Sequence, residues 1–260
     1  MIRSVDLNAD LGEGFGRWQA GDDAALMPLL TSANIACGFH AGGPEEMARA
    51  MRQALEADVQ IGAHPGFADL AHFGRRRLPV TREEAANAVA YQLGAAQAMA
   101  AQVGGKIRHL KLHGALSNMA AEDALLARAC FKAALAVDPD IILVILPGTD
   151  LEVAAADLDA RIACEIFADR AYEDDGTLVD RRERHAVQHD PEKAARRVLA
   201  MLEAQAIISH NGKLIPTRID TICIHGDTPG AVAMARLLRS RLEKEGVAIR
   251  PFRGERLPSV

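Results

Sequence analysis

The sequence contains few cysteines and few aromatic residues. Four cysteines occur in 260 residues, and phenylalanine, tryptophan and tyrosine together make up 4% of the chain. The cysteines are far apart and form no Cys-x-x-Cys pair; they are Cys37, Cys130, Cys164 and Cys223. This pattern argues against a disulfide scaffold and against a structural zinc site, because both need closely spaced or numerous cysteines. We therefore expect buried free thiols.

An excess of positive charge and long apolar runs are also missing. The formal net charge is -5, and no basic stripe is interleaved with aromatic residues. A nucleic-acid partner is therefore not expected. No stretch reaches the roughly 18 apolar residues of a membrane-spanning helix, and the first ten residues, MIRSVDLNAD, contain no apolar signal core. We expect a cytoplasmic protein without a membrane partner.

Short apolar runs alternate with helical patterns along the whole chain, which is typical of β/α units around a parallel sheet. Strands are predicted over Ser4–Ala9, Ser32–Cys37, Gln60–His64, His109–His113, Ile141–Leu146, Arg161–Ala168 and Thr221–His225. Helices are predicted over Pro44–Ala57, Thr81–Gln102, Glu122–Ala136, Asp150–Asp157, Pro191–Ile208 and Pro229–Glu245. No linker rich in proline, glycine or serine divides the chain, so we expect one domain over residues 1–260.

Two architectures fit this order: an open, doubly wound sheet and a closed (β/α) barrel. In the first strand the polar residues Asp6, Asn8 and Asp10 alternate with apolar ones, and the same alternation occurs in HLKLHG and TICIHGD. A buried strand of an open sheet is normally apolar on both faces. A polar barrel interior with a site at the carboxyl ends of the strands accounts for all three segments. The pattern therefore favours an α/β barrel.

Ionisable residues recur at the ends of the predicted strands. They are Asp6, Asp10, His40, His64, Lys111, His113, Glu165, Asp169, Arg170, His225 and Asp227. Each charge taken out of water costs several kcal/mol unless it is paired. A chain that places so many of them at equivalent strand ends is expected to assemble them into one catalytic or binding site.

The known nucleotide motifs are missing. The chain has no G-x-x-x-x-G-K-[ST] sequence, and the glycines of GEGFG, Gly12, Gly14 and Gly16, are not followed directly by a predicted helix. There is also no G-x-S-x-G and no H-E-x-x-H motif. The supply of carboxylates and imidazoles leaves a bound catalytic metal open.

Six ordered motifs together resemble the LamB/YcsF family, which contains the A subunits of bacterial 5-oxoprolinase. They are DLNADLGE (Asp6–Glu13), SANIACGFHAG (Ser32–Gly42), IGAHPGF with DL and FGRR (Ile61–Arg76), LKLHGAL (Leu110–Leu116), EIFADRAY (Glu165–Tyr172) and CIHGDTPGAV (Cys223–Val232). The resemblance implies a divergent seven-stranded TIM-like barrel, related to the glycoside hydrolase/deacetylase barrels. It also implies ATP-dependent hydrolysis of the lactam 5-oxo-L-proline to L-glutamate, together with the 5-oxoprolinase B and C subunits. The chain departs from the family pattern at Gly43, Leu112 and Ser117.

A mechanism consistent with the resemblance assigns ATP, with Mg²⁺, to a composite site shared with the partner subunits. In this hypothesis Asp10 or His113 is the general base, and Lys111 stabilises the developing oxyanion or phosphate. His225 and Asp227 form a pair of base and orienting carboxylate. The predicted substrate contacts are Asp6, Asn8, His40, His64, Asp169 and Arg170, with Arg170 as a clamp for the substrate carboxylate.

Two alternatives to this mechanism remain. One is a metal-dependent deacetylase or amidohydrolase that acts alone. The other is a noncatalytic subunit that binds the lactam or organises its partners. Bound metal in the purified protein, with loss of activity on chelation, would favour the first alternative. Full activity of the partner subunits without this chain would favour the second.

Overall fold

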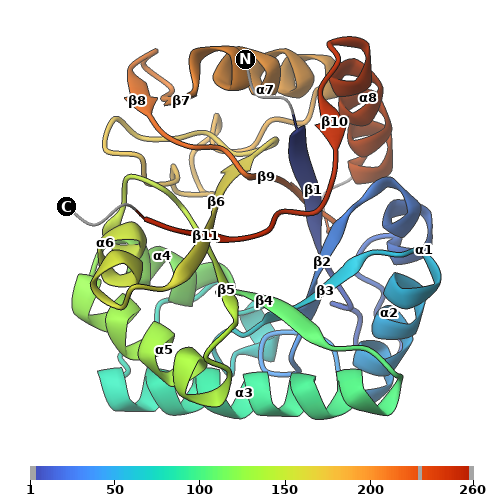
Figure 1. Ribbon diagram of the computed structural model, residues 1–260, viewed down its shortest axis with the longest axis vertical. Coiled ribbons are helices and arrows are strands. Elements are labelled where there is room, and N and C mark those ends of the chain that lie inside the picture. Colours follow the sequence, from blue (N-terminus) through green and yellow to red (C-terminus); the bar gives the residue numbers. More distant parts are fainter. Residues whose placement is uncertain (1–3, 228–229, 258–260) are drawn as a thin grey trace.

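Seven parallel strands close a barrel in the computed structural model, which describes residues 4–227 and 230–257. In order around the barrel they are β1 (Ser4–Leu11), β2 (Ser32–Ala36), β3 (Gln60–His64), β4 (Ile107–Lys111), β5 (Ile142–Ile145), β6 (Arg161–Phe167) and β9 (Thr221–His225). Each strand pairs with the next, and β9 pairs with both β6 and β1, which closes the ring (Figure 1). The predicted barrel is confirmed.

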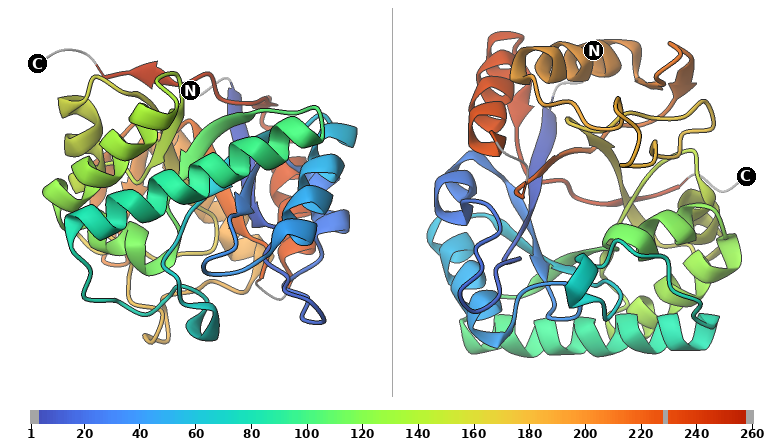
Figure 2. Two further views of the ribbon diagram at one scale, coloured as in Figure 1. Left: turned by 90° about the horizontal axis from the view of Figure 1, so that it is seen from below. Right: turned by 180° about the vertical axis from the view of Figure 1, so that it is seen from behind.

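Helices surround this barrel (Figure 1). They are α1 (Asp23–Leu26), α2 (Pro44–Glu56), α3 (Arg82–Gln102), α4 (Gly114–Ala121), α5 (Ala124–Val137), α6 (Asp150–Asp157), α7 (Pro191–Ala204) and α8 (Ala231–Lys244), with 3₁₀ turns η1 (Met27–Leu29) and η2 (Leu70–His72). The 21-residue α3 runs along one side of the molecule (Figure 2). Among the described residues, no helix combines the length and the apolar character needed to cross a membrane.

Local sequence signals account for where several helices begin. The Thr81 hydroxyl accepts from the Glu84 amide, and the Glu84 carboxylate accepts from the Thr81 amide at 2.7 Å, so the predicted capping box of α3 is formed. Helix α2 begins at Pro44 behind an extended Gly43. Proline suits this first position because it has no N–H to leave unpaired and its φ is already helical.

Other boundaries differ from the prediction. The fourth strand ends at Lys111, and His113 occupies the N-cap position of α4, a helix that the pattern does not indicate. The predicted helix over Glu122–Ala136 begins instead at Ala124, because the Asp123 carboxylate caps α5. The predicted start of the last helix at Pro229 lies outside the described residues.

The predicted helix over Pro191–Ile208 is too long at its end. Helix α7 stops because Gln205 adopts a left-handed conformation with φ of 49°. The next residues form β7 (Ala206–Ile208), which pairs with β8 (Leu214–Pro216) as a hairpin. Two short strands near the end of the chain extend the sheet, β10 (Ala248–Ile249) beside β1 and β11 (Glu255–Arg256) beside β6.

The interior of the barrel is polar and internally hydrogen-bonded. The Asn8 amide donates to Glu165 Oε1 at 2.9 Å and to the Thr221 hydroxyl at 2.7 Å. The Asn34 amide donates to Asn8 Oδ1 at 2.7 Å, and His109 Nε2 contacts Asn34 Oδ1 at 2.8 Å. A buried polar network of this kind is stable only when its members find partners. The alternation of polar and apolar residues in β1 therefore reflects a polar interior and an apolar outer face.

Asp6 lies at the start of this interior. Hydroxyl groups of Thr31, Ser32 and Thr221 donate to its carboxylate. Burial raises the pKa of Asp6 from 3.8 to about 6, although these hydrogen bonds favour the charged form. Between pH 4 and pH 6, Asp6 is therefore largely protonated in the folded state and largely ionised in the unfolded state.

We expect Asp6→Asn to remove a pH-dependent loss of stability. A raised folded-state pKa stabilises the fold below the unfolded value, and this contribution disappears as the pH rises through the folded value. Between pH 4 and pH 7.5 the wild type should lose roughly 2 kcal/mol through Asp6, a loss that asparagine cannot show. Urea unfolding of both proteins at the two pH values measures it. An identical pH dependence in both proteins would contradict the assignment.

Candidate active site

A cavity of about 800 Å³ opens at the carboxyl ends of the barrel strands. Five of the residues that line it lie at the ends of five strands: Asp10, His64, Lys111, Phe167 and His225. The loop from Tyr172 to Asp190 and the arginine-rich loop that follows β3 supply much of the remaining wall. Because parallel strands all end at the same rim, side chains distant in the sequence meet there.

A buried ammonium group lies among acidic partners at the closed end. Lys111 Nζ lies 3.0 Å from Asp10 Oδ1, 3.0 Å from Glu165 Oε1 and 3.0 Å from Cys223 Sγ. Burial opposes the charge on Lys111, but Asp10 and its other neighbours outweigh burial and hold the lysine pKa well above its ordinary value. Burial likewise opposes the Asp10 charge, yet His64 and Lys111 hold the pKa of Asp10 well below its ordinary range. Asp10 is therefore a weak proton acceptor, which disfavours it as the general base.

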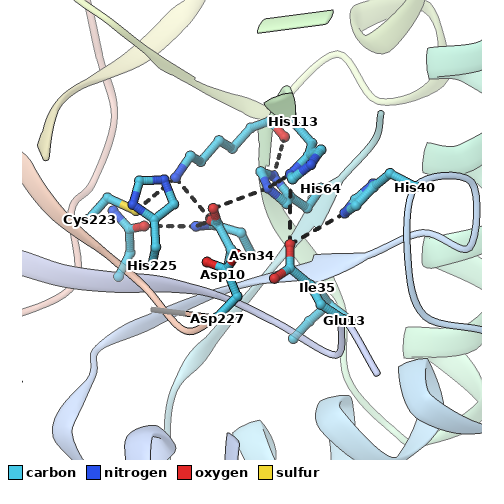
Figure 3. A network of polar contacts seen from close by, with 12 residues as sticks. Asp10, Glu13, Asn34, Ile35, His40, His64, His113, Cys223, His225 and Asp227 are labelled. Carbon is cyan, nitrogen blue, oxygen red and sulfur yellow. Dashed lines mark hydrogen bonds and ion pairs between the residues drawn. The ribbon is translucent and has the colours of Figure 1, made fainter. Parts of the chain in front are cut away.

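A second cluster consists of Glu13, His40, His64 and His113 (Figure 3). The rings of His40 and His113 stack at 3.7 Å with an interplanar angle of 5°. His113 Nδ1 lies 2.9 Å from His64 Nε2, and Glu13 Oε1 lies 3.5 Å from His40 Nε2. Burial lowers the pKa of His40 and of His113 well below 6.5, so both rings are neutral at neutral pH.

His225 is oriented by a carboxylate other than the predicted one. Its Nδ1 lies 2.8 and 2.9 Å from the two carboxylate oxygens of Asp169, and its ring stacks on Phe167. Burial would raise the pKa of Asp169, but His225 beside it outweighs burial and lowers that pKa. The predicted pairing of His225 with Asp227 is therefore corrected, because Asp227 lies 2.5 Å from a guanidinium nitrogen of Arg75.

Guanidinium groups form much of the cavity wall. The arginines that line it are Arg75, Arg76, Arg77, Arg170, Arg181 and Arg182. Arg170 is buried and donates to the backbone oxygens of Val179 and Ala186 at 2.7 and 3.4 Å. It therefore holds the loop from Tyr172 to Asp190, here called the covering loop, against the barrel. Burial and the neighbouring charge of Arg75 lower the pKa of Arg181. The predicted role of Arg170 as a clamp for a substrate carboxylate stays a prediction.

The predicted site residues fall into two layers. The cavity is lined by Asp10, His64, Lys111, His113, Arg170, His225 and Asp227. The other four predicted residues lie behind this lining and are buried: Asp6, Asn8, His40 and Asp169. Asp6 and Asn8 form hydrogen bonds inside the barrel, and their predicted substrate contacts stay a prediction.

Three groups at the site have no role in the sequence prediction. Glu13 follows β1 directly in DLGE, and its position just beyond the strand is the available signal. Glu165 is among the strand-end residues, but no role is predicted for it. The arginines of the covering loop carry no local signal, because a charged loop is usually solvated. Two departures from the family pattern, Leu112 and Ser117, also line the cavity.

The LamB/YcsF family model matches residues 5–256. The chain is 56% identical over 248 residues to the 5-oxoprolinase A subunit of Ruegeria pomeroyi, and the match covers 95% of this chain and 98% of that protein. It is 54% identical over 251 residues to the 5-oxoprolinase A subunit of Rhodopseudomonas palustris, with coverage of 96% and 99%.

Two solved structures share the fold of this chain. The crystal structure of the lactam utilization protein from Thermus thermophilus superposes with a TM-score of 0.89 at 43% identity, covering 96% of this chain and 100% of that one. The catalytic domain of peptidoglycan N-acetylglucosamine deacetylase from Eubacterium rectale shares the fold alone, with a TM-score of 0.52 at 9% identity, covering 96% of this chain and 89% of that one. From the family match and these identities, the chain belongs to the LamB/YcsF family.

Proposed function

We propose that this chain is the A component of an ATP-dependent 5-oxoprolinase, and that its cavity holds 5-oxo-L-proline while the lactam is hydrolysed to L-glutamate. The names of the close relatives support the reaction. The observation that carries the assignment to the cavity is its polarity. The Lys111 ammonium and the His225–Asp169 pair are buried, whereas most of the arginines that line the cavity are at least one-third exposed. This arrangement matches a small lactam that bears a carboxylate.

Hydrolysis requires that water add across the amide bond, with its oxygen bonding to the carbonyl carbon and a proton reaching the ring nitrogen. His225 is the better general base because Asp169 engages Nδ1, which leaves Nε2 for proton exchange with water or substrate. His113 is less suited because Nδ1 faces His64 and Nε2 contacts the Phe73 backbone oxygen. In this proposal the buried Lys111 ammonium stabilises the oxyanion or a phosphate on the same oxygen.

Arginine side chains suit the anionic parts of the substrates. The planar guanidinium group binds a carboxylate or phosphate through two parallel hydrogen bonds. Arg75 and Arg181 both line the cavity, and Arg75 is already paired with Asp227 at 2.5 Å. A substrate carboxylate would compete with Asp227 for this guanidinium.

ATP enters this proposal through a composite site with the B and C subunits, because the chain contains no P-loop sequence. Transfer of the γ-phosphoryl group to the amide oxygen, with release of ADP, would make the carbonyl carbon more electrophilic. Water would add to this carbon, the bond to the ring nitrogen would break as that nitrogen takes a proton, and an acyl phosphate would remain for a second water to hydrolyse. The overall balance then uses two waters, one to open the lactam and one to release phosphate, and yields ADP, phosphate and L-glutamate.

Reconstitution tests the proposal. The chain is combined with its candidate B and C subunits, 5-oxoproline and Mg-ATP, and glutamate and phosphate are measured. We expect ATP-dependent glutamate formation that requires all three subunits. Full activity of B and C alone would instead indicate a scaffold, and glutamate formation by the chain without ATP would indicate a stand-alone amidohydrolase. Either outcome would overturn the proposal.

A further inference from the structure

Glu13, His40, His64 and His113 form a cluster of potential metal ligands that contains no lysine or arginine. His64 ends β3, and Glu13, His40 and His113 lie on the segments that follow β1, β2 and β4. One potential ligand atom from each of the four side chains lies within 4.8 Å of the others (Figure 3). All four residues are buried, with exposed fractions of 5% or less. The cluster therefore offers one carboxylate oxygen and three imidazole nitrogens to a ligand at its centre.

The backbone determines which ring nitrogens carry hydrogen. His64 Nδ1 lies 2.8 Å from the Lys111 backbone oxygen, and His113 Nε2 lies 2.9 Å from the Phe73 backbone oxygen. A carbonyl oxygen can only accept, so each of these nitrogens is the N–H of its ring. With one hydrogen on each ring, His64 Nε2 and His113 Nδ1 are therefore the nitrogens that carry lone pairs. These two lone pairs face one another across 2.9 Å.

Further acceptors converge on the same point. Asp10 Oδ2 lies 3.3 Å from His64 Nε2, and Glu13 Oε1 lies 3.7 Å from His113 Nδ1. Among the described residues, Glu13 Oε1 and His40 Nε2 have no hydrogen-bond partner. A single proton shared by His64 Nε2 and His113 Nδ1 would relieve the contact between these two nitrogens. It would leave Glu13 Oε1 and His40 Nε2 without a partner. A cation at the centre of the cluster would satisfy all of these acceptors together.

The spacing and the surroundings agree with a metal ion. Zinc bonds of about 2.0–2.2 Å to nitrogen and oxygen place neighbouring tetrahedral ligands about 3.4 Å apart. Three separations between these ligand atoms, 2.9, 3.5 and 3.7 Å, lie around this value, and all four atoms lie within 4.8 Å of one another. Metal-binding histidines typically donate their other N–H to a carboxylate, a backbone carbonyl or water, and His64 and His113 have backbone carbonyls in this place.

His40 is held rigidly in place. An added Cβ at Gly66 would lie 2.8 Å from His40 Nδ1, and one at Gly74 would lie 2.6 Å from the His40 Cβ. The ring therefore lies between two close backbone segments and the stacked His113 ring. A histidine that is only a packing residue gains nothing from this constraint, whereas a ligand gains a preset orientation.

We propose that Glu13, His40, His64 and His113 bind one divalent transition-metal ion, and that Zn²⁺ fits this donor set best. Three nitrogens and one carboxylate oxygen are ligands that zinc accepts, and calcium and magnesium prefer oxygen alone. Three of the four residues line the cavity, so the ion would lie at its wall. This proposal does not depend on the proposed lactam chemistry, because metal content is measured on the chain alone.

Metal titration of the purified chain tests the proposal. After dialysis against a chelator, Zn²⁺ and, as a spectroscopic probe, Co²⁺ are added, and binding is followed by calorimetry and by visible absorption. We expect one equivalent to bind, with the visible absorption of a tetrahedral Co²⁺ site. The chain without metal should unfold at a lower temperature than the chain with Zn²⁺.

Three variants locate the site. Glu13→Gln keeps the side-chain shape and His40→Phe keeps a flat ring. Each should weaken Zn²⁺ binding by at least about 10- to 100-fold, the usual loss when an outer-shell partner of a metal ligand is removed. His225 lines the same cavity but is not part of the cluster. The His225→Gln variant should therefore bind Zn²⁺ with unchanged affinity. Should His40→Phe fail to fold, Glu13→Gln decides the question alone. Absence of stoichiometric binding to the wild type, or binding lost in His225→Gln and retained in Glu13→Gln, would overturn the proposal.

Discussion

Replacing His225 with glutamine is expected to lower kcat for 5-oxoproline-dependent glutamate formation about 10²- to 10⁴-fold, the usual contribution of a general base. His225 lies at the end of β9, and Asp169 holds its Nδ1 at 2.8 Å. Glutamine keeps a polar side chain of similar reach but cannot exchange a proton near neutral pH. The reconstituted complex with saturating Mg-ATP provides the assay, and thermal unfolding of the variant shows whether the fold is retained.

Two further variants make this result specific. His189→Gln changes an exposed histidine of the covering loop and should leave kcat unchanged. Asp169→Asn removes the orienting carboxylate and should lower kcat less than His225→Gln does, with a shift in the pH profile of kcat/KM. Retention of more than about a tenth of the wild-type kcat by His225→Gln would exclude it as the base.

Lys111→Met is expected to lower the free energy of unfolding by about 3–5 kcal/mol. Lys111 is 5% exposed, and its ammonium lies 3.0 Å from carboxylate oxygens of both Asp10 and Glu165. Methionine preserves most of the side-chain volume but leaves these two carboxylates buried without their cation. The loss therefore comes from unpaired charge and not from a cavity. Urea unfolding at neutral pH measures it.

The matched control is Lys106→Met, an exposed lysine just before β4, which should change the free energy of unfolding by no more than about 0.5 kcal/mol. Glu165→Gln added to Lys111→Met removes one of the stranded charges and should restore about 1 kcal/mol or more. If Lys111→Met proves as stable as the wild type, the ion pairs around Lys111 contribute little to the fold.

The architecture could be predicted from the sequence because it depends on local, repeated patterns. The alternation of Asp6, Asn8 and Asp10 with apolar residues has the period of a strand, and it requires a polar interior wherever that strand is buried. Helix starts followed from capping residues such as Thr81. Boundaries were less well predicted where a single backbone conformation decides them, as at Gln205, whose left-handed φ ends α7.

The partners within the site could not be predicted in the same way. The sequence by itself determined the barrel, its polar lining and the presence of ionisable residues at the strand ends, because these follow from periodicity over a few residues. Only the tertiary structure decided that His225 pairs with Asp169, 56 residues away, and that Asp227 meets Arg75, 152 residues away. It also brought Glu13 to the three histidines. Barrel closure and loop conformation determine these distances, and neither leaves a periodic signal in the chain.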